Sequence, residues 1–183
     1  EKEMKINIPE SINELTLSQW QQVTALGDEI TERKSLDIFY GIRGHKFNQL
    51  KAKDINHLVQ EVAKLFQTPN KLSRTFKYNG IKYGLIPNLD DIGFDELTEM
   101  DLHLEPESYH KLMSVLYRPI VRETMGTYEI EPFNGANDEL KDMPLGVALG
   151  VIDFFFRLGR ELVQATLKSS GMTTEELEML SVS

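Results

Sequence analysis

The sequence contains no cysteine, so structural disulfides and thiolate metal sites are excluded. It also lacks an excess of positive charge: the formal net charge is −9, which argues against a nucleic-acid-binding surface. No apolar run is long enough to span a bilayer, because Asp153 and Arg157 interrupt the most apolar stretch. The composition is compatible with a reducing cytoplasm, and we expect binding to neither nucleic acid nor a membrane.

Recognisable catalytic and cofactor motifs are missing as well. There is no GxGxxG, no GxSxG and no cysteine nucleophile, and no serine lies in a nucleophile context. Residues 41–46 (GIRGHK) carry basic side chains beside glycine but lack the pattern of a phosphate-binding loop, so a helix end is the simpler interpretation. We therefore expect a non-enzymatic protein with no catalytic residue and no cofactor.

One group of side chains has a spacing that suits a metal ion. His103, Glu107 and His110 are at i, i+4 and i+7, so one helix could present all three to zinc. Pro106 interrupts such a helix and HExxH is absent, so we favour a solvated polar surface. The acids of residues 90–96 do not have the spacing of an EF-hand and are more typical of a turn before a helix. The sequence thus predicts no metal site.

The most apolar stretch is residues 145–168 (LGVALGVIDFFFRLGRELVQATLK), which predicts a long central helix. Asp142 is placed to be its N-cap, and Pro144 falls in the first turn, where a missing N–H does no harm. One apolar stripe has the i, i+3, i+4, i+7 spacing of a buried helix face. Its members are Leu145, Ala148, Leu149, Ile152, Phe155, Phe156, Leu162 and Val163.

A second apolar stripe lies beside the first and consists of Val147, Val151, Phe154 and Leu158. A helix that is apolar on most of its circumference is either enclosed by its own domain or docked against another chain. Enclosure is the more common arrangement. If a partner docks instead, the second stripe is the candidate partner-binding surface, because consecutive phenylalanines cannot all enter one core and aromatic residues anchor interfaces.

The rest of the chain predicts a mainly α fold of the α+β class, with one β-hairpin and one or two short strands. Asn79-Gly80 between two alternating runs is a strong hairpin signal, because a type I′ turn needs positive φ at both positions. Arg118, before Pro119 at a helix end, can form a structural ion pair with a nearby acid. Helices are expected at residues 17–26, 31–42, 55–66 (capped by Asp54), 95–102 and 107–117, and short strands at 4–8 and 128–131.

These elements predict a single domain over residues 1–183. Its parts are a helical region (1–70), a hairpin with helices (71–135), the central helix (136–170) and a short C-terminal tail helix (171–183).

Several stretches together resemble a known group of proteins. They are residues 6–23 (INIPESINELTLSQWQQV), 81–97 (IKYGLIPNLDDIGFDEL), 112–121 (LMSVLYRPIV), 128–135 (YEIEPFNG) and 141–162 (KDMPLGVALGVIDFFFRLGREL). They are similar to a family of small proteins encoded by tailed bacteriophages and prophages, mostly of unassigned function, some of which look like tail assembly chaperones. The resemblance includes no catalytic motif, so it transfers no functional residue.

The resemblance implies a non-enzymatic role in the cytoplasm of a bacterial host. A tail assembly chaperone would keep the long apolar tape measure protein soluble while tail tube proteins assemble around it. This needs an exposed apolar groove for a helix and a net charge that keeps the complex in solution. The alternative is a structural virion component, such as a head–tail connector, completion or baseplate protein. A homo-oligomer is compatible with both roles.

Overall fold

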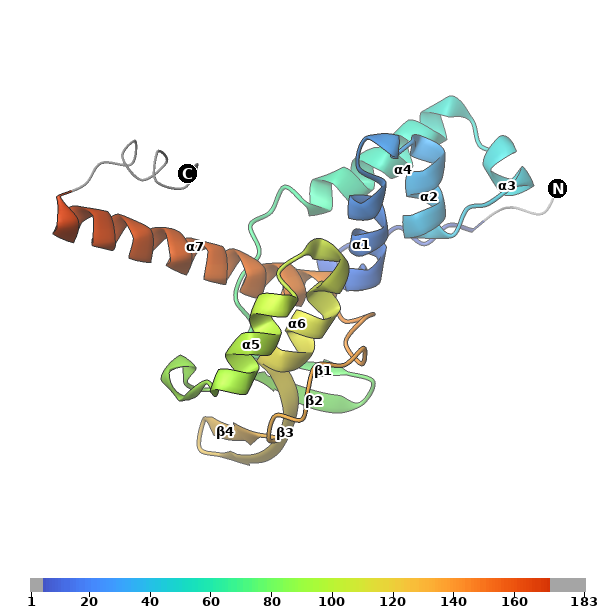
Figure 1. Ribbon diagram of the computed structural model, residues 1–183. Helices are drawn as coiled ribbons and strands as arrows, with labels where there is room; N and C mark the ends of the chain where they lie inside the picture. Colours follow the sequence, from blue (N-terminus) through green and yellow to red (C-terminus); the bar gives the residue numbers. More distant parts are fainter. Residues whose placement is uncertain (1–4, 172–183) are drawn as a thin grey trace.

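The computed structural model describes residues 5–171, which form seven α-helices and one four-stranded antiparallel sheet (Figure 1). The predicted α+β class is confirmed. The helices are α1 (Leu17–Leu26), α2 (Glu32–Tyr40), α3 (His45–Asn48), α4 (Ala52–Leu65), α5 (Phe94–Leu102), α6 (Tyr109–Leu116) and α7 (Leu145–Ser170). The strands are β1 (Thr75–Tyr78), β2 (Ile81–Leu85), β3 (Tyr117–Thr124) and β4 (Thr127–Ile130).

The N-terminal region is helical, as predicted. Thr16 caps α1: its hydroxyl accepts a hydrogen bond from Gln19 N at 3.2 Å, and the Gln19 side chain accepts one from Thr16 N at 2.8 Å. The predicted cap of α4 is wrong, because α4 begins at Ala52 after Lys51, and Asp54 lies inside its first turn. An acid there still interacts favourably with the helix dipole.

The strand predicted at residues 4–8 is wrong for the part that the structure describes, since residues 5–8 are irregular. Ile6 and Ile8 pack instead against a small cluster formed by Leu36, Ile42 and Leu58. The alternating pattern therefore reflects apolar side chains that cover this cluster, and no neighbouring strand takes up the backbone hydrogen bonds.

The sheet has the order β1-β2-β3-β4, with each pair antiparallel. The Asn79-Gly80 hairpin is confirmed: both residues have positive φ, 50° and 78°. The predicted strand at 128–131 corresponds to β4. The eight-residue β3 was not predicted, because Pro119 looks like a terminator; in the sheet its carbonyl accepts a hydrogen bond from Glu131 N at 2.9 Å.

The main core lies where α6, β2, β3 and the start of α7 meet. Tyr117 is buried there, its hydroxyl donates a hydrogen bond to Ser73 O at 2.6 Å, and burial raises the pKa of its phenol. Asp142 is not the N-cap of α7; that position is occupied by Pro144. The Leu145 N–H instead donates to Leu15 O at 2.9 Å, so another segment of the backbone satisfies the helix end.

The two halves of α7 have different surroundings. The proximal half (residues 145–152) is embedded in the core, whereas the distal half (residues 153–170) extends beyond the other described elements (Figure 1), although its Leu167 is buried. The predicted burial of the first stripe is therefore wrong for Phe156, Leu162 and Val163, which are 62%, 61% and 53% exposed. The helix has 26 residues and is about 39 Å long. Most of the predicted tail helix, residues 172–183, lies outside the described residues.

Candidate functional site

An apolar groove with a volume of about 300 Å³ lies between α7 and the helices α5 and α6. Its position follows from the fold: α6 forms the floor, α5 and the loop after it form one wall, and α7 forms the other. The residues that line it are Met100 and Leu104 on the first wall, Tyr109, Leu112 and Leu116 on the floor, and Ile152, Phe155 and Phe156 on α7.

The floor of the groove is fixed from behind by α1. The ring of Trp20 stacks on Tyr109 with 5.7 Å between centroids and 8° between planes. The side-chain amide of Gln21 donates hydrogen bonds to the carbonyl oxygens of Pro106 at 2.8 Å and Glu107 at 3.0 Å. These contacts hold the start of α6 against a helix that is more than 80 residues earlier in the chain. The floor is therefore pre-formed, which lowers the entropic cost of binding.

The α5 wall is fixed to the sheet by an ion pair. Arg118 on β3 lies 2.6 Å from the Glu96 carboxylate on α5, and both side chains are largely buried. The Glu96 carboxylate also accepts a hydrogen bond from Gly93 N at 2.7 Å, which caps α5. The ion pair predicted for Arg118 is confirmed. Loss of either partner would leave a buried charge unpaired, so the pair keeps α5 in place.

The two walls of the groove differ in charge. All charged side chains of α5 are acidic, but the Glu96 carboxylate is buried and paired with Arg118, so the accessible acids are Asp95, Glu99 and Asp101. Residues 157–168 of α7 have the opposite balance, with Arg157, Arg160 and Lys168 against Glu161. The groove thus has one acidic rim, which favours an apolar ligand with basic flanking residues.

Exposed apolar side chains also occur on the elements that form the two walls of the groove. Leu97, Leu102 and Leu104 are exposed on or beside α5, and Leu162 and Val163 are exposed on the distal half of α7. Leu104 and Phe156, which are more than half exposed, belong to the groove lining itself, and exposed apolar patches of this kind mark interaction sites. The arrangement can bind an apolar helix, and apart from the Tyr109 hydroxyl its lining residues carry no polar side chain.

The predicted partner-binding residues are only partly accessible. Val147 and Val151 are 5% and 0% exposed, so the structure corrects this part of the prediction and places both in the core. Phe154 and Leu158 are half-buried, and Phe154 contacts Phe155 edge to face at 5.3 Å between centroids. The groove lies on the first stripe, not on the second. In the sequence, the only indication of this groove was that the first stripe continues beyond Phe156.

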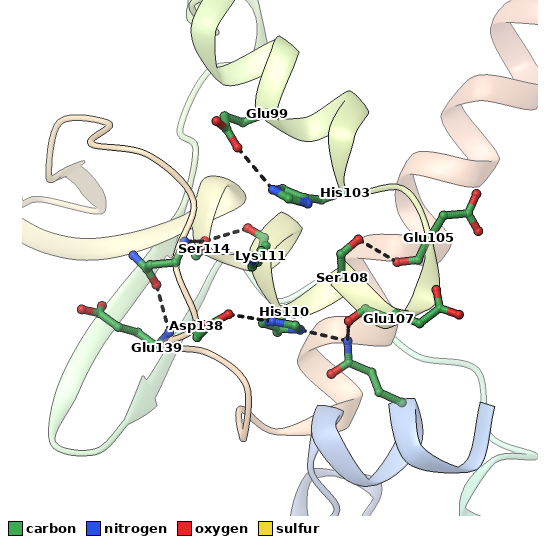
Figure 2. Close-up of polar contacts among 12 residues, drawn as sticks. Glu99, His103, Glu105, Glu107, Ser108, His110, Lys111, Ser114, Asp138 and Glu139 are labelled. Carbon is green, nitrogen blue, oxygen red and sulfur yellow. Dashed lines mark hydrogen bonds and ion pairs between the residues drawn. The ribbon is translucent and has the colours of Figure 1, made fainter. Parts of the chain in front are cut away.

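The side chains considered for zinc do not converge (Figure 2). His103 lies 3.2 Å from Glu99 on its own helical turn, and the Glu107 side chain is exposed. One ring nitrogen of His110 lies 3.1 Å from the Gln21 amide nitrogen, and the other lies 2.8 Å from the Asp138 carboxylate. Both ring nitrogens are therefore engaged. Among residues 5–171 no three side chains form a metal-binding cluster.

The other two motifs considered have structural roles. Gly41 adopts the left-handed conformation (φ 66°) and ends α2, as predicted, and Arg43 pairs with Asp37, whereas His45 and Lys46 already belong to α3. Asp90 and Asp91 lie in a short 3-10 turn, where the Asn88 side chain accepts a hydrogen bond from Asp90 N at 3.2 Å.

Comparisons of the chain with protein-family models, with curated protein sequences and with solved structures found no match. In the described part of the chain, no helix combines the length and the hydropathy needed to cross a bilayer. The groove is therefore interpreted from its own geometry and charge.

Proposed function

We propose that the protein is a non-enzymatic assembly protein of a tailed bacteriophage, and that its groove binds an apolar helix of the tape measure protein during tail assembly in the host cytoplasm. The observation that carries this proposal is the groove between α5, α6 and α7, with its almost wholly apolar lining and its open side. The sequence resemblance to tail assembly chaperones supplies the biological context.

The shape of the site supports a helical ligand. Helix-in-groove recognition uses apolar side chains at i, i+3, i+4 and i+7 of the ligand, which enter a groove between helices. Phe155 and Phe156 on one wall and Leu104 on the other provide large apolar contacts for such side chains. The pre-formed floor under Tyr109 allows binding without ordering of the site first.

The charge of the chain supports the chaperone role in two ways. A net charge of −9 keeps a complex with an apolar client in solution. The acidic α5 wall selects clients whose apolar stripe is flanked by lysine or arginine, and disfavours acidic helices.

The alternative is a structural virion component, such as a head–tail connector, completion or baseplate protein. The observation that favours it is the long distal half of α7, since subunits of a ring can bury such a helix against a neighbour. The two roles differ in whether the protein is present in the finished particle. A chaperone leaves before the particle is complete, whereas a structural subunit stays in fixed copy number.

The groove is tested by coexpression with the tape measure protein of the same phage. Phe156→Asp places a charge in the groove wall, and we expect it to abolish the increase in soluble tape measure protein that the native chain gives. Gln164→Asp is the matched control, because it adds the same charge to an exposed position on the polar side of α7. Equal solubilisation by Phe156→Asp and the native chain would contradict the proposal.

Mass spectrometry of purified phage particles separates the two roles. Absence of the protein from particles, together with its recovery bound to the tape measure protein from infected cells, is the result expected of a chaperone. Presence in particles at a fixed ratio to the tail tube protein would overturn the chaperone role and favour the structural alternative.

A further inference from the structure

The apolar residues of α7 are arranged symmetrically about Gly159. Phe155 and Phe156 precede it by four and three residues, and Leu162 and Val163 follow it by three and four. Residues with this spacing lie on one face of a helix. The face therefore has the same pattern in both directions from Gly159, and an antiparallel copy of the helix would present the same pattern to it.

The two sides of this symmetric pattern differ in what surrounds them. Phe155 and Phe156 form a wall of the groove, whereas Leu162 and Val163 are 61% and 53% exposed. Gly159 is open as well, because a Cβ added to it would meet no atom within 4 Å. A second helix can thus approach the α7 backbone closely at this residue. One part of its apolar stripe would then cover the groove, and the other part would cover Leu162 and Val163.

We infer that two copies of the chain pair through α7 in antiparallel orientation, with the helices crossing at Gly159. Phe156 of each copy then packs against Leu162 of the other copy, and Phe155 against Val163. Each copy inserts the distal half of its α7 into the groove of the other. The contact is isologous, so both grooves are filled at once and the assembly closes as a dimer. The inference rests on the proposed function, because the dimer covers the same groove as the client.

Charge complementarity favours a second copy as the occupant. The distal half of α7 carries three basic residues and two acids, with only one acid after Arg157, and the accessible charged side chains of the α5 wall that it would lie along are all acidic. The helix that each copy offers therefore has the properties that the groove selects: an apolar stripe with basic flanking residues. In a two-fold dimer the basic distal half of α7 in each copy lies along the acidic α5 wall of the other copy.

The exposed apolar area is sufficient for a weak dimer. Phe156 is 62% exposed, which is roughly 100 Å² for an aromatic side chain of about 150–250 Å², and the exposed parts of Leu162, Val163 and Leu104 are on the order of 100 Å² each. Two copies together with the groove walls then bury about 1,000 Å², which is the lower end of specific interfaces. A weak dimer protects the apolar groove from aggregation and still releases it when a longer client helix binds.

The absence of native cysteine allows a clean cross-linking test. In an antiparallel pair only residues at the crossing point meet their own counterparts. Gly159→Cys should therefore cross-link to itself with a short bismaleimide reagent. Thr166→Cys should not, because the two copies of that residue would be about 21 Å apart. Cross-linking of neither variant, or of both equally, would overturn the antiparallel pairing.

Sedimentation velocity over a wide range of protein concentration gives the second readout. We expect the native chain to shift from monomer to dimer, and Leu162→Asp to remain monomeric while keeping the circular dichroism spectrum of the native chain. A native chain that stays monomeric throughout would overturn the inference.

The two proposals fail in different ways. If no dimer forms but Phe156→Asp still loses the ability to solubilise the tape measure protein, only the pairing is wrong. If the dimer forms and no tape measure protein is bound, the proposed function is wrong.

Discussion

The proximal and distal halves of α7 share one apolar stripe but differ in burial. In the proximal half Leu145, Ala148 and Val151 are fully buried, whereas in the distal half Phe156 and Leu162 are more than half exposed. The stripe itself is apolar in both halves, and charged side chains occur only on the rest of the distal half. The difference lies in the neighbours, because α6, β3 and the segment around Leu15 surround only the first two turns. A periodic stripe therefore identifies a face that needs a partner, but it does not say whether the partner is in the same chain.

The largest effect is expected from a charge in the proximal half. Val151→Asp buries an unpaired carboxylate at a position with no exposed surface, and we expect a loss of about 4 kcal/mol or more in the free energy of unfolding. Urea unfolding followed by circular dichroism measures it, with Gln164→Asp as the control on the exposed side of the same helix. Native-like stability of Val151→Asp would show that the proximal half is not core.

A second large effect on stability is expected at α5, the groove wall opposite α7, where an ion pair anchors it to the sheet. Arg118→Ala leaves the buried Glu96 carboxylate without its partner, which should lower the free energy of unfolding by about 3–5 kcal/mol. Arg122→Ala is the matched control on the same strand, since its pair with Glu129 is exposed and its loss should matter by less than about 1 kcal/mol. Equal effects of the two substitutions in urea unfolding would contradict the role given to the Glu96–Arg118 pair.

Two glycines allow the same substitution to be made in both halves of the helix. A Cβ at Gly150 would collide with the Lys71 carbonyl oxygen, so Gly150→Ala should destabilise the protein by about 1–3 kcal/mol. Gly159 faces open space, and Gly159→Ala should stabilise the isolated chain by up to about 1 kcal/mol through helix propensity. Thermal unfolding of the two variants side by side checks the opposite signs. The same sign for both would show that the halves of α7 do not differ as described.

The smallest effect on stability is expected from Leu162→Asp. Its side chain is 61% exposed, so the change should alter the free energy of unfolding of the monomer by no more than about 0.5 kcal/mol. Urea unfolding at low protein concentration, where the monomer predominates, measures this value. A loss comparable to that of Val151→Asp would mean that the distal half is packed against the domain.

Much of the fold could be predicted because local signals determine it. The capping box at Thr16, the left-handed end at Gly41 and the Asn79-Gly80 turn each depend on a few adjacent residues, and the structure has all three. Features that depend on distant segments were missed. Asp142 looked like a cap, but the backbone of Leu15 meets the start of α7 instead. The strand β3 was missed because its pairing with β2 and β4 outweighs the local signal of Pro119.

The candidate site was predicted less well than the fold. The pattern of α7 showed two apolar stripes and an aromatic cluster, but it could not show which stripe the core would cover. That depends on where α5 and α6 lie, which is set by long-range contacts such as Glu96–Arg118 and Trp20–Tyr109. Val147 and Val151 were assigned to a partner surface for this reason, although both are core residues.

Hydrogen–deuterium exchange mass spectrometry of the chain, alone and with a soluble fragment of the tape measure protein, tests most directly whether the groove beside α7 is the client surface. We expect new protection in α5 and in residues 153–169 of α7, with little change in the sheet or in α2–α4. Protection confined to the sheet or to α2–α4, with α7 unchanged by the client, would contradict the assignment of the groove as the binding site.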